Sequence, residues 1–159
     1  MGAGKTATGK SLADLAQMGF LDLDEELESQ NHLTINEIFQ KKGEPFFRKE
    51  EKRILKEAAR QANTVVATGG GLVLDPENVA QMKATGRVLY LEASFEKLWE
   101  RVRDKKDRPL LRASDPKGVF FMLFQQRRPL YEAACSGKVD SEGLSPEAVA
   151  RKIIGLYLK

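Results

Sequence analysis

The first residues of the chain have the composition of a phosphate-binding loop. Gly2 and Gly4 lead into Lys5 and Thr6, and a helical pattern begins directly after them. Small residues let backbone N–H groups curl around phosphate oxygens, the lysine can reach the β- and γ-phosphates, and the hydroxyl can ligate Mg²⁺. The positive end of the helix dipole adds to this attraction. These residue types in this order indicate a P-loop.

The loop can be aligned to the P-loop pattern in two frames. Residues 4–11 match G-x-x-x-x-G-K-[ST] letter for letter and would make Lys10 the phosphate lysine, whereas the second frame uses Lys5. We favour the second frame because it leaves room for a helix over residues 5–18, closed by Gly19 as its C′ residue. In that frame Lys10 is a surface lysine.

Two acids separated by one residue lie at the end of the first predicted strand, residues 20–23. Asp22 and Asp24 lie where this strand ends, and ligands of open parallel sheets bind beyond the carboxyl ends of the strands. One carboxylate could face Mg²⁺ or its waters, and the other a substrate hydroxyl. The alternative is that Asp24 only caps a helix over residues 25–30 and that Asp22 is a surface acid.

Three consecutive glycines, Gly69, Gly70 and Gly71, follow a second predicted strand over residues 64–68. Glycines at a strand end allow another molecule to approach the backbone closely, and their N–H groups can bind an anion. The alternative is a flexible turn that binds nothing.

Several arginines could bind anionic groups, because the guanidinium fork matches a carboxylate. Arg48 lies on a long predicted helix, and Arg127 and Arg128 lie on another. Taken singly, each is more typical of a solvated surface. Arg108 lies in a basic stretch, residues 104–115, which we expect to form a mobile lid loop whose arginine closes over transferring phosphate.

Short apolar runs alternate with helical patterns along the chain. This alternation predicts an α/β fold with a parallel sheet and right-handed crossovers, in one domain of residues 1–159. The expected strands are 20–23, 64–68, 87–92 and 138–140, and the expected helices are 5–18, 25–30, 34–43, 45–62, one that starts at Asp75, 94–103, 116–134 and 145–157.

Composition limits the class of protein. A chain of 159 residues with 42% hydrophobic and 31% charged residues is typical of one soluble domain, and no apolar run reaches the length of a membrane span. The formal net charge of +3 suits small anionic substrates and is too weak to indicate nucleic acid. His32 and Cys135 are the only residues of their types, so spacing supports neither a zinc site nor a Cys–His nucleophile. A lone cysteine suits the cytosol.

Together these motifs resemble the shikimate kinase family over nearly the whole chain. Each motif is weak alone, but the order and spacing are specific, and the triple glycine with both arginine motifs separates this family from other P-loop kinases. The matching stretches are 1–6, 8–10, 12–13, 22–24, 35–39, 43–44, 47–48, 68–71, 108–111, 127–131 and 144–146.

The resemblance implies a three-layer, nucleoside-monophosphate-kinase-like fold around a central parallel sheet. The family pattern has five strands, and its first strand, which would precede Met1, is absent from this sequence. The implied activity is the phosphorylation of the 3-hydroxyl of shikimate by ATP, with Mg²⁺, in aromatic amino-acid biosynthesis. We expect a cytoplasmic monomer that binds shikimate and has no nucleic-acid or membrane partner.

Residue roles follow from the same resemblance. Catalytic roles are implied for Lys5, Asp24 and the lid arginine Arg108, and metal binding is implied for Thr6 and Asp22. The implied nucleotide-binding residues are Gly2, Ala3, Gly4, Lys5, Thr6, Ala7, Arg103 and Arg108. The implied substrate-binding residues are Asp24, Arg48, Gly69, Gly70, Gly71 and Arg127, in which the two arginines clamp the carboxylate.

Two other hypotheses stay open on the sequence alone. One is a different small-molecule P-loop kinase, acting on gluconate or a nucleotide, although paired arginines and a triple glycine favour a carboxylated, hydroxylated ring. The other is a non-catalytic protein that binds shikimate or a nucleotide through a broken P-loop. The retained phosphate lysine, acid and clamp arginines argue against that loss of activity, and the absent strand argues for it.

Overall fold

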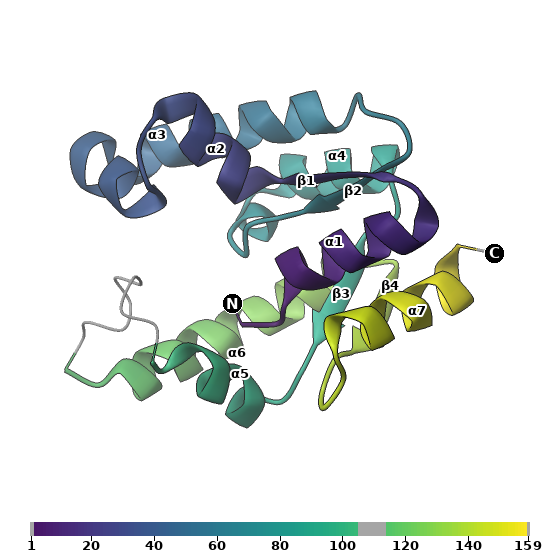
Figure 1. Cartoon of the computed structure of the whole chain (residues 1–159). Coiled ribbons are helices and arrows are strands. Elements are labelled where there is room, and N and C mark those ends of the chain that lie inside the picture. The colour runs from purple at the N-terminus through teal and green to yellow at the C-terminus, as the bar shows by residue number, and fades with distance from the viewer. Residues whose placement is uncertain (1, 105–113, 159) are drawn as a thin grey trace.

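Helices alternate with four short strands in the computed structural model, which describes residues 2–104 and 114–158 (Figure 1). Most elements lie within a few residues of their expected positions. The elements are α1 (Lys5–Ala16), β1 (Gly19–Asp22), α2 (Leu23–Asn31), α3 (Ile35–Ala58), β2 (Thr64–Ala67), the 3₁₀ turn η1 (Leu72–Leu74), α4 (Pro76–Thr85), β3 (Leu89–Glu92), α5 (Phe95–Val102), α6 (Pro116–Ala134), β4 (Gly137–Asp140) and α7 (Pro146–Tyr157).

The strands lie between two helical layers. Val65 of β2, together with Leu89 and Leu91 of β3, packs against a core formed by α1, β4 and α7. The next residue of β2, Val66, packs with Leu21 of β1 against a second core formed by α2, α3 and α4. Because successive strand residues point to opposite faces, these two cores lie on opposite sides of the strands. The three-layer α/β architecture expected from the sequence is confirmed.

The parallel strands pair as two ribbons and not as one continuous sheet. Among the described residues, β1 pairs in parallel with β2 from Gly19 and Thr64 onward, and β3 pairs in parallel with β4 from Leu89 and Gly137 onward. The other edges of β2 and β3 both line one cavity of about 530 Å³ with largely apolar walls. The strands therefore form two separate ribbons, and this cavity lies between them.

The end of α1 is also different from the prediction. The helix ends at Ala16, and Gln17 adopts a left-handed conformation with φ 55° while its N–H contacts the carbonyls of Ala13 and Asp14. Gly19, the expected closing residue, is instead the first residue of β1. The chain thus turns from helix to strand within two residues.

A single run, α3, replaces two expected helices and changes direction at Gly43. This glycine has φ 80° and ψ 169°, a conformation that other residues rarely adopt, and Pro45 follows it in the next turn. The first half opens with the expected capping box between Thr34 and Glu37. The change of direction is what places the second half, with Arg48, beside the glycines after β2.

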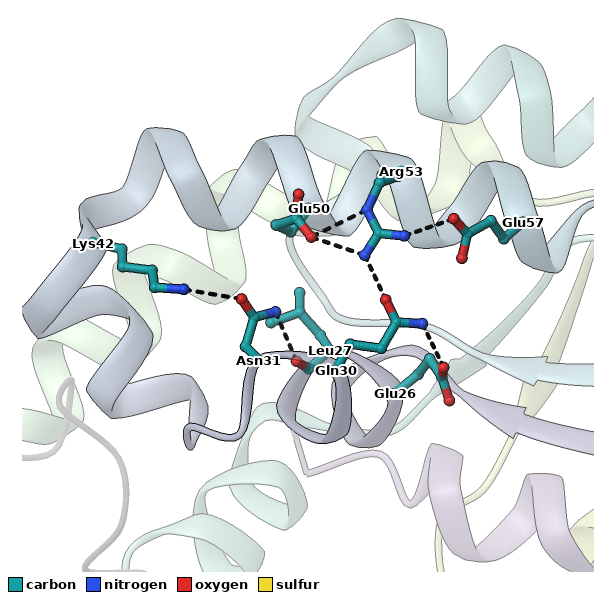
Figure 2. Close-up of polar contacts among 8 residues, drawn as sticks. All are labelled: Glu26, Leu27, Gln30, Asn31, Lys42, Glu50, Arg53 and Glu57. Carbon is teal, nitrogen blue, oxygen red and sulfur yellow. Dashed lines mark hydrogen bonds and ion pairs between the residues drawn. The ribbon is translucent and has the colours of Figure 1, made fainter.

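Polar contacts tie α2 to α3 (Figure 2). Arg53 of α3 donates a hydrogen bond to Gln30 of α2, and Lys42 donates one to Asn31 at 3.2 Å. Leu27 of α2 is fully buried in the core between the same two helices. These contacts hold together the helices that carry the acids and one of the arginines described below.

Candidate active site

The phosphate loop lies before α1, and its glycines have conformations that favour glycine. Gly2 and Gly4 have φ of 75° and 79°. A Cβ on Gly2 would come within 2.9 Å of Val102 Cγ1 on α5, and Arg101 of the same helix donates a hydrogen bond to the Gly2 carbonyl at 3.1 Å. The loop is therefore held against α5, and α1 begins directly after it at Lys5.

Lys10 lies outside this loop, as the second frame predicts. Gly9 is inside α1, where an added Cβ would come within 2.7 Å of the Phe20 ring, so this glycine allows α1 to pack on β1. Lys10 forms an exposed ion pair with Glu25, with Nζ and Oε1 3.2 Å apart. Lys5, in contrast, lines the cavity between the two ribbons. The geometry favours Lys5 as the phosphate lysine.

Thr6 and Asp22, the two expected metal ligands, are in direct contact. The Thr6 hydroxyl donates a hydrogen bond to Asp22 Oδ2 at 2.6 Å. Asp22 Oδ1 accepts from the N–H of Asp24 at 3.0 Å, so Asp22, and not Asp24, is the N-cap of α2. These two oxygen ligands beside a phosphate loop fit Mg²⁺, which usually takes one or two protein oxygens and completes its shell with phosphate and water.

The triple glycine lies among the expected substrate-binding side chains. A Cβ on Gly69 would come within 2.9 Å of both Asp24 Oδ1 and Glu51 Oε1. A Cβ on Gly71 would overlap the guanidinium of Arg48, coming within 2.8 Å of its Cζ. Glycine is required here because the side chains of Asp24, Glu51 and Arg48 occupy the space that a methyl group would take. The turn that was expected to bind an anion is thus in contact with an acid from α2 and an arginine from α3.

Gly70, the middle glycine, faces α6. The Tyr131 hydroxyl donates a hydrogen bond to the Gly70 carbonyl at 2.8 Å. A Cβ on Gly70 would lie 3.0 Å from that hydroxyl and 3.7 Å from Arg127 Nη1. Arg127 of α6 therefore also lies beside the glycine turn, so the turn contacts side chains from three helices.

Arg48 is held in place by acids of its own helix. Its guanidinium bonds Glu51 at 2.8 Å and Glu44 at 3.1 Å. The Glu51 side chain is only 3% exposed. Burial raises the pKa of this carboxyl above its ordinary value, while Arg48 lowers it; the charges of Asp24 and Arg127 also act on it. The acids and both arginines therefore form one electrostatic cluster around the glycines.

Among the other expected residues, Ala3 belongs to the phosphate loop and packs against the apolar cluster between α5 and α6. Arg103 follows α5 and pairs with the next residue at 3.5 Å, with both side chains exposed. Arg128 pairs with Glu132 at 3.2 Å on the exposed side of α6. Arg108, and with it most of the expected lid, lies outside the described residues.

Three residues of the site carry no role in the prediction from sequence: Arg101, Glu51 and Tyr131. Glu51 follows Arg48 by three residues and Tyr131 follows Arg127 by four, which is the spacing of neighbours on one helix face. That spacing could have pointed to both residues. Arg101 had no comparable signal, because its partner Gly2 is at the other end of the chain sequence.

The acids after β1 connect the two ends of the site. Asp22 accepts from the Thr6 hydroxyl of the phosphate-loop end, and Asp24, two positions further on, lies beside Gly69 of the glycine cluster. The arrangement can hold a nucleoside triphosphate by its phosphates next to an acid and a pair of arginines. Such a site is suited to a second substrate that carries a carboxylate and hydroxyl groups.

Comparison with known proteins gives the same family at every level. The model of the shikimate kinase family matches residues 1–157. Shikimate kinase of Aromatoleum aromaticum is 40% identical over 153 residues, which is 96% of this chain and 87% of that protein. Shikimate kinase of Thermodesulfovibrio yellowstonii is 42% identical over 159 residues, covering 99% of this chain and 90% of that protein.

Solved structures of shikimate kinases have the same fold as this chain. A shikimate kinase from Acinetobacter baumannii in complex with shikimate superposes with a TM-score of 0.94 at 37% identity, covering 99% of this chain and 88% of that one. The enzyme from Bacteroides thetaiotaomicron gives a TM-score of 0.89 at 31% identity, covering 100% and 94% of the two chains. In the parts of this chain that the structure describes, no helix has the length and apolar character needed to span a membrane.

Proposed function

The chain belongs to the shikimate kinase family, and we propose that its site transfers the γ-phosphoryl group of ATP to the 3-hydroxyl of shikimate. The activity of the family is the ATP-dependent phosphorylation of shikimate in aromatic biosynthesis. The observation that supports the proposal for this chain is the contact between the Thr6 hydroxyl and Asp22, because Asp24, two positions further on, lies against Gly69 of the glycine cluster.

At the phosphate end, Lys5 neutralises charge on the β- and γ-phosphates, and the loop N–H groups hold their oxygens. Thr6 and Asp22 hold Mg²⁺ with the phosphates, and the ion when bound would further neutralise the charge of the transferred group. Arg103 contacts the adenine. Arg108 neutralises charge on the transferred group.

At the substrate end, Arg48 beside Gly71 and Arg127 beside Gly70 bind the shikimate carboxylate, and the N–H groups of Gly70 and Gly71 add hydrogen bonds. The burial of Glu51 beside Arg48 supports this role, since it keeps one guanidinium in position before substrate arrives. Asp24 orients the 3-hydroxyl.

The chemical step is an in-line displacement. The 3-hydroxyl oxygen bonds to the γ-phosphorus, the bond from phosphorus to the bridging oxygen of ADP breaks, and the hydroxyl proton passes to Asp24. Phosphoryl transfer leaves little covalent work for a protein, so the catalytic effect comes from positioning and charge neutralisation. We further propose that the chain acts as a monomer in the cytoplasm.

A substrate panel tests this function. The purified chain is incubated with ATP and Mg²⁺ and with shikimate, gluconate or a nucleoside monophosphate, and products are identified by phosphorus NMR. We expect phosphate only on shikimate, at the 3-position. Transfer to gluconate or to a nucleotide would assign the chain to another kinase activity. Binding of shikimate and ATP without any product would support the non-catalytic alternative.

A further inference from the structure

Tyr131 connects the glycine turn to the helix that carries Arg127. Its hydroxyl donates to the Gly70 carbonyl at 2.8 Å, a contact between residues 61 positions apart. Its ring packs on Tyr90 of β3, with the ring centroids 5.4 Å apart. Through Tyr131, α6 is therefore hydrogen-bonded to the backbone of the loop that follows β2.

Arg127 lies one helical turn before Tyr131 and next to the same hydroxyl. The positions of the Tyr131 hydroxyl and of Arg127 Nη1 beside Gly70 show that both groups face this residue. Burial raises the pKa of the Tyr131 hydroxyl, and the charge and hydrogen bonding of Arg127 lower it by less. Because the net direction is upward, the hydroxyl stays protonated at neutral pH and keeps its hydrogen for the Gly70 carbonyl.

A hydrogen bond to the Gly70 carbonyl also fixes the N–H group of Gly71. The two groups belong to one peptide bond, which is planar and trans, so they point in opposite directions. With the carbonyl held toward Tyr131 and α6, the N–H points away from them. One hydroxyl therefore controls the orientation of a backbone donor and lies against the guanidinium of Arg127.

We propose that Tyr131 is a positioning residue that sets the specificity of the site for a carboxylate, by fixing the Gly71 N–H and the Arg127 guanidinium relative to each other. This inference rests on the function proposed above. The Gly71 N–H and Arg127 belong to different ribbons: the glycine turn follows β2, while α6 leads into β4. Without the hydroxyl, the two donors are held by separate parts of the fold.

The test compares Tyr131→Phe with Tyr90→Phe. Both variants remove one phenolic oxygen from the same pair of packed rings, so the second controls for changes in ring packing. We expect Tyr131→Phe to raise the KM for shikimate about 3- to 10-fold, the effect of one lost hydrogen bond. The kcat, the KM for ATP and the melting temperature should stay close to wild type, and Tyr90→Phe should leave the KM for shikimate unchanged.

A second readout separates positioning from general loosening of the site. A shikimate analogue with the carboxylate reduced to an alcohol should bind wild type and Tyr131→Phe with equal affinity in calorimetry. Equal shikimate KM in wild type and Tyr131→Phe, or an equal loss for acid and alcohol, would overturn the inference. If wild type itself fails to bind shikimate, the proposed function fails instead, so the two failures are distinguishable.

Discussion

Asp22 and Asp24 are one residue apart and face different ends of the site. Asp22 accepts from the Thr6 hydroxyl, whereas Asp24 lies beside Gly69. The spacing predicts that these acids divide their roles between Mg²⁺ and a substrate hydroxyl, and this division stays a prediction. The alternative, Asp24 as the helix cap, is wrong because Asp22 supplies the cap with its second oxygen. The sequence could not distinguish the two because either acid precedes a helical pattern.

Asp24→Asn tests the role of the second acid. The substitution keeps the shape of the side chain and removes its charge. We expect kcat to fall strongly, by about 100-fold or more, as for the loss of a group that transfers a proton, while the affinity for ATP changes little. Stopped-flow or coupled-assay kinetics with direct measurement of ATP binding would show the split. Unchanged turnover in this variant would remove Asp24 from the catalytic machinery.

Glu51 should make stability depend on pH. Its folded-state pKa is raised above the ordinary value of 4.5 by burial, so the folded protein holds this proton more tightly than the unfolded chain. The contribution of this proton to the free energy of unfolding is therefore complete below about pH 4.5, and it is lost as the pH rises through the raised pKa of Glu51. The glutamine in Glu51→Gln does not titrate, so this variant lacks the pH-dependent contribution.

The measurement is the free energy of unfolding of wild type and Glu51→Gln by urea at a series of pH values. We expect the value for wild type minus the value for the variant to fall as the pH increases from about 4 to 7. A difference that is constant or that rises over this range would contradict the raised pKa.

At the scale of elements, most helices and strands were predicted because their signals are local. The capping box at Thr34 and the Pro starts of α4, α6 and α7 mark the helix beginnings. Helix ends were less predictable: Gln17 takes the left-handed position that a glycine was expected to fill. The function of the triple glycine was only partly predictable, because the side chains around it come from α2, α3 and α6.

Gly71→Ala tests the fit between the glycine turn and α3. The added methyl group would overlap the Arg48 guanidinium, which must then leave its pair with Glu51. Breaking a buried hydrogen-bonded charge pair costs about 2–5 kcal/mol. We expect a rise of at least about 10-fold in the KM for shikimate, with little change in the KM for ATP.

Gly155→Ala is the matched control for this variant. Gly155 lies in α7, and a Cβ there would meet no atom within 4 Å. Its kinetic constants should equal those of wild type. Should Gly71→Ala bind shikimate as well as this control does, Arg48 would not belong to the carboxylate site.

At the scale of the whole molecule, the division of the strands into two ribbons is the main feature. The sequence predicted all four strands, but strand pairing depends on contacts between distant residues, which periodicity does not reveal. The cavity between β2 and β3 is lined by apolar side chains of both strands, such as Val65 and Leu91, and its wall continues to Lys5. Its apolar lining matches an added strand that would pair with the facing edges of β2 and β3.

An engineered extension tests this match. A short β-branched strand sequence ending in Gly-x is joined ahead of Gly2, and the control carries the same extension with two prolines in the strand. Buried backbone groups that gain partners contribute about 0.5–1.5 kcal/mol each. We therefore expect a higher melting temperature and tighter ATP binding with the strand sequence than with the proline control. Equal values for both would show that the cavity does not accept a strand.

The most direct test of the proposed function is the rate of shikimate 3-phosphate formation from ATP, measured for wild type, Lys5→Ala and Lys10→Ala. Lys5 lines the cavity beside the glycine cluster, and Lys10 pairs with Glu25 on the surface. We predict product from wild type, a fall of about 100-fold or more in kcat for Lys5→Ala, and a rate within about 2-fold of wild type for Lys10→Ala, since exposed ion pairs contribute little. A near-normal kcat for Lys5→Ala together with no activity for Lys10→Ala would contradict the assignment of Lys5 as the phosphate lysine. Wild type that binds both substrates and forms no product would contradict the proposed function.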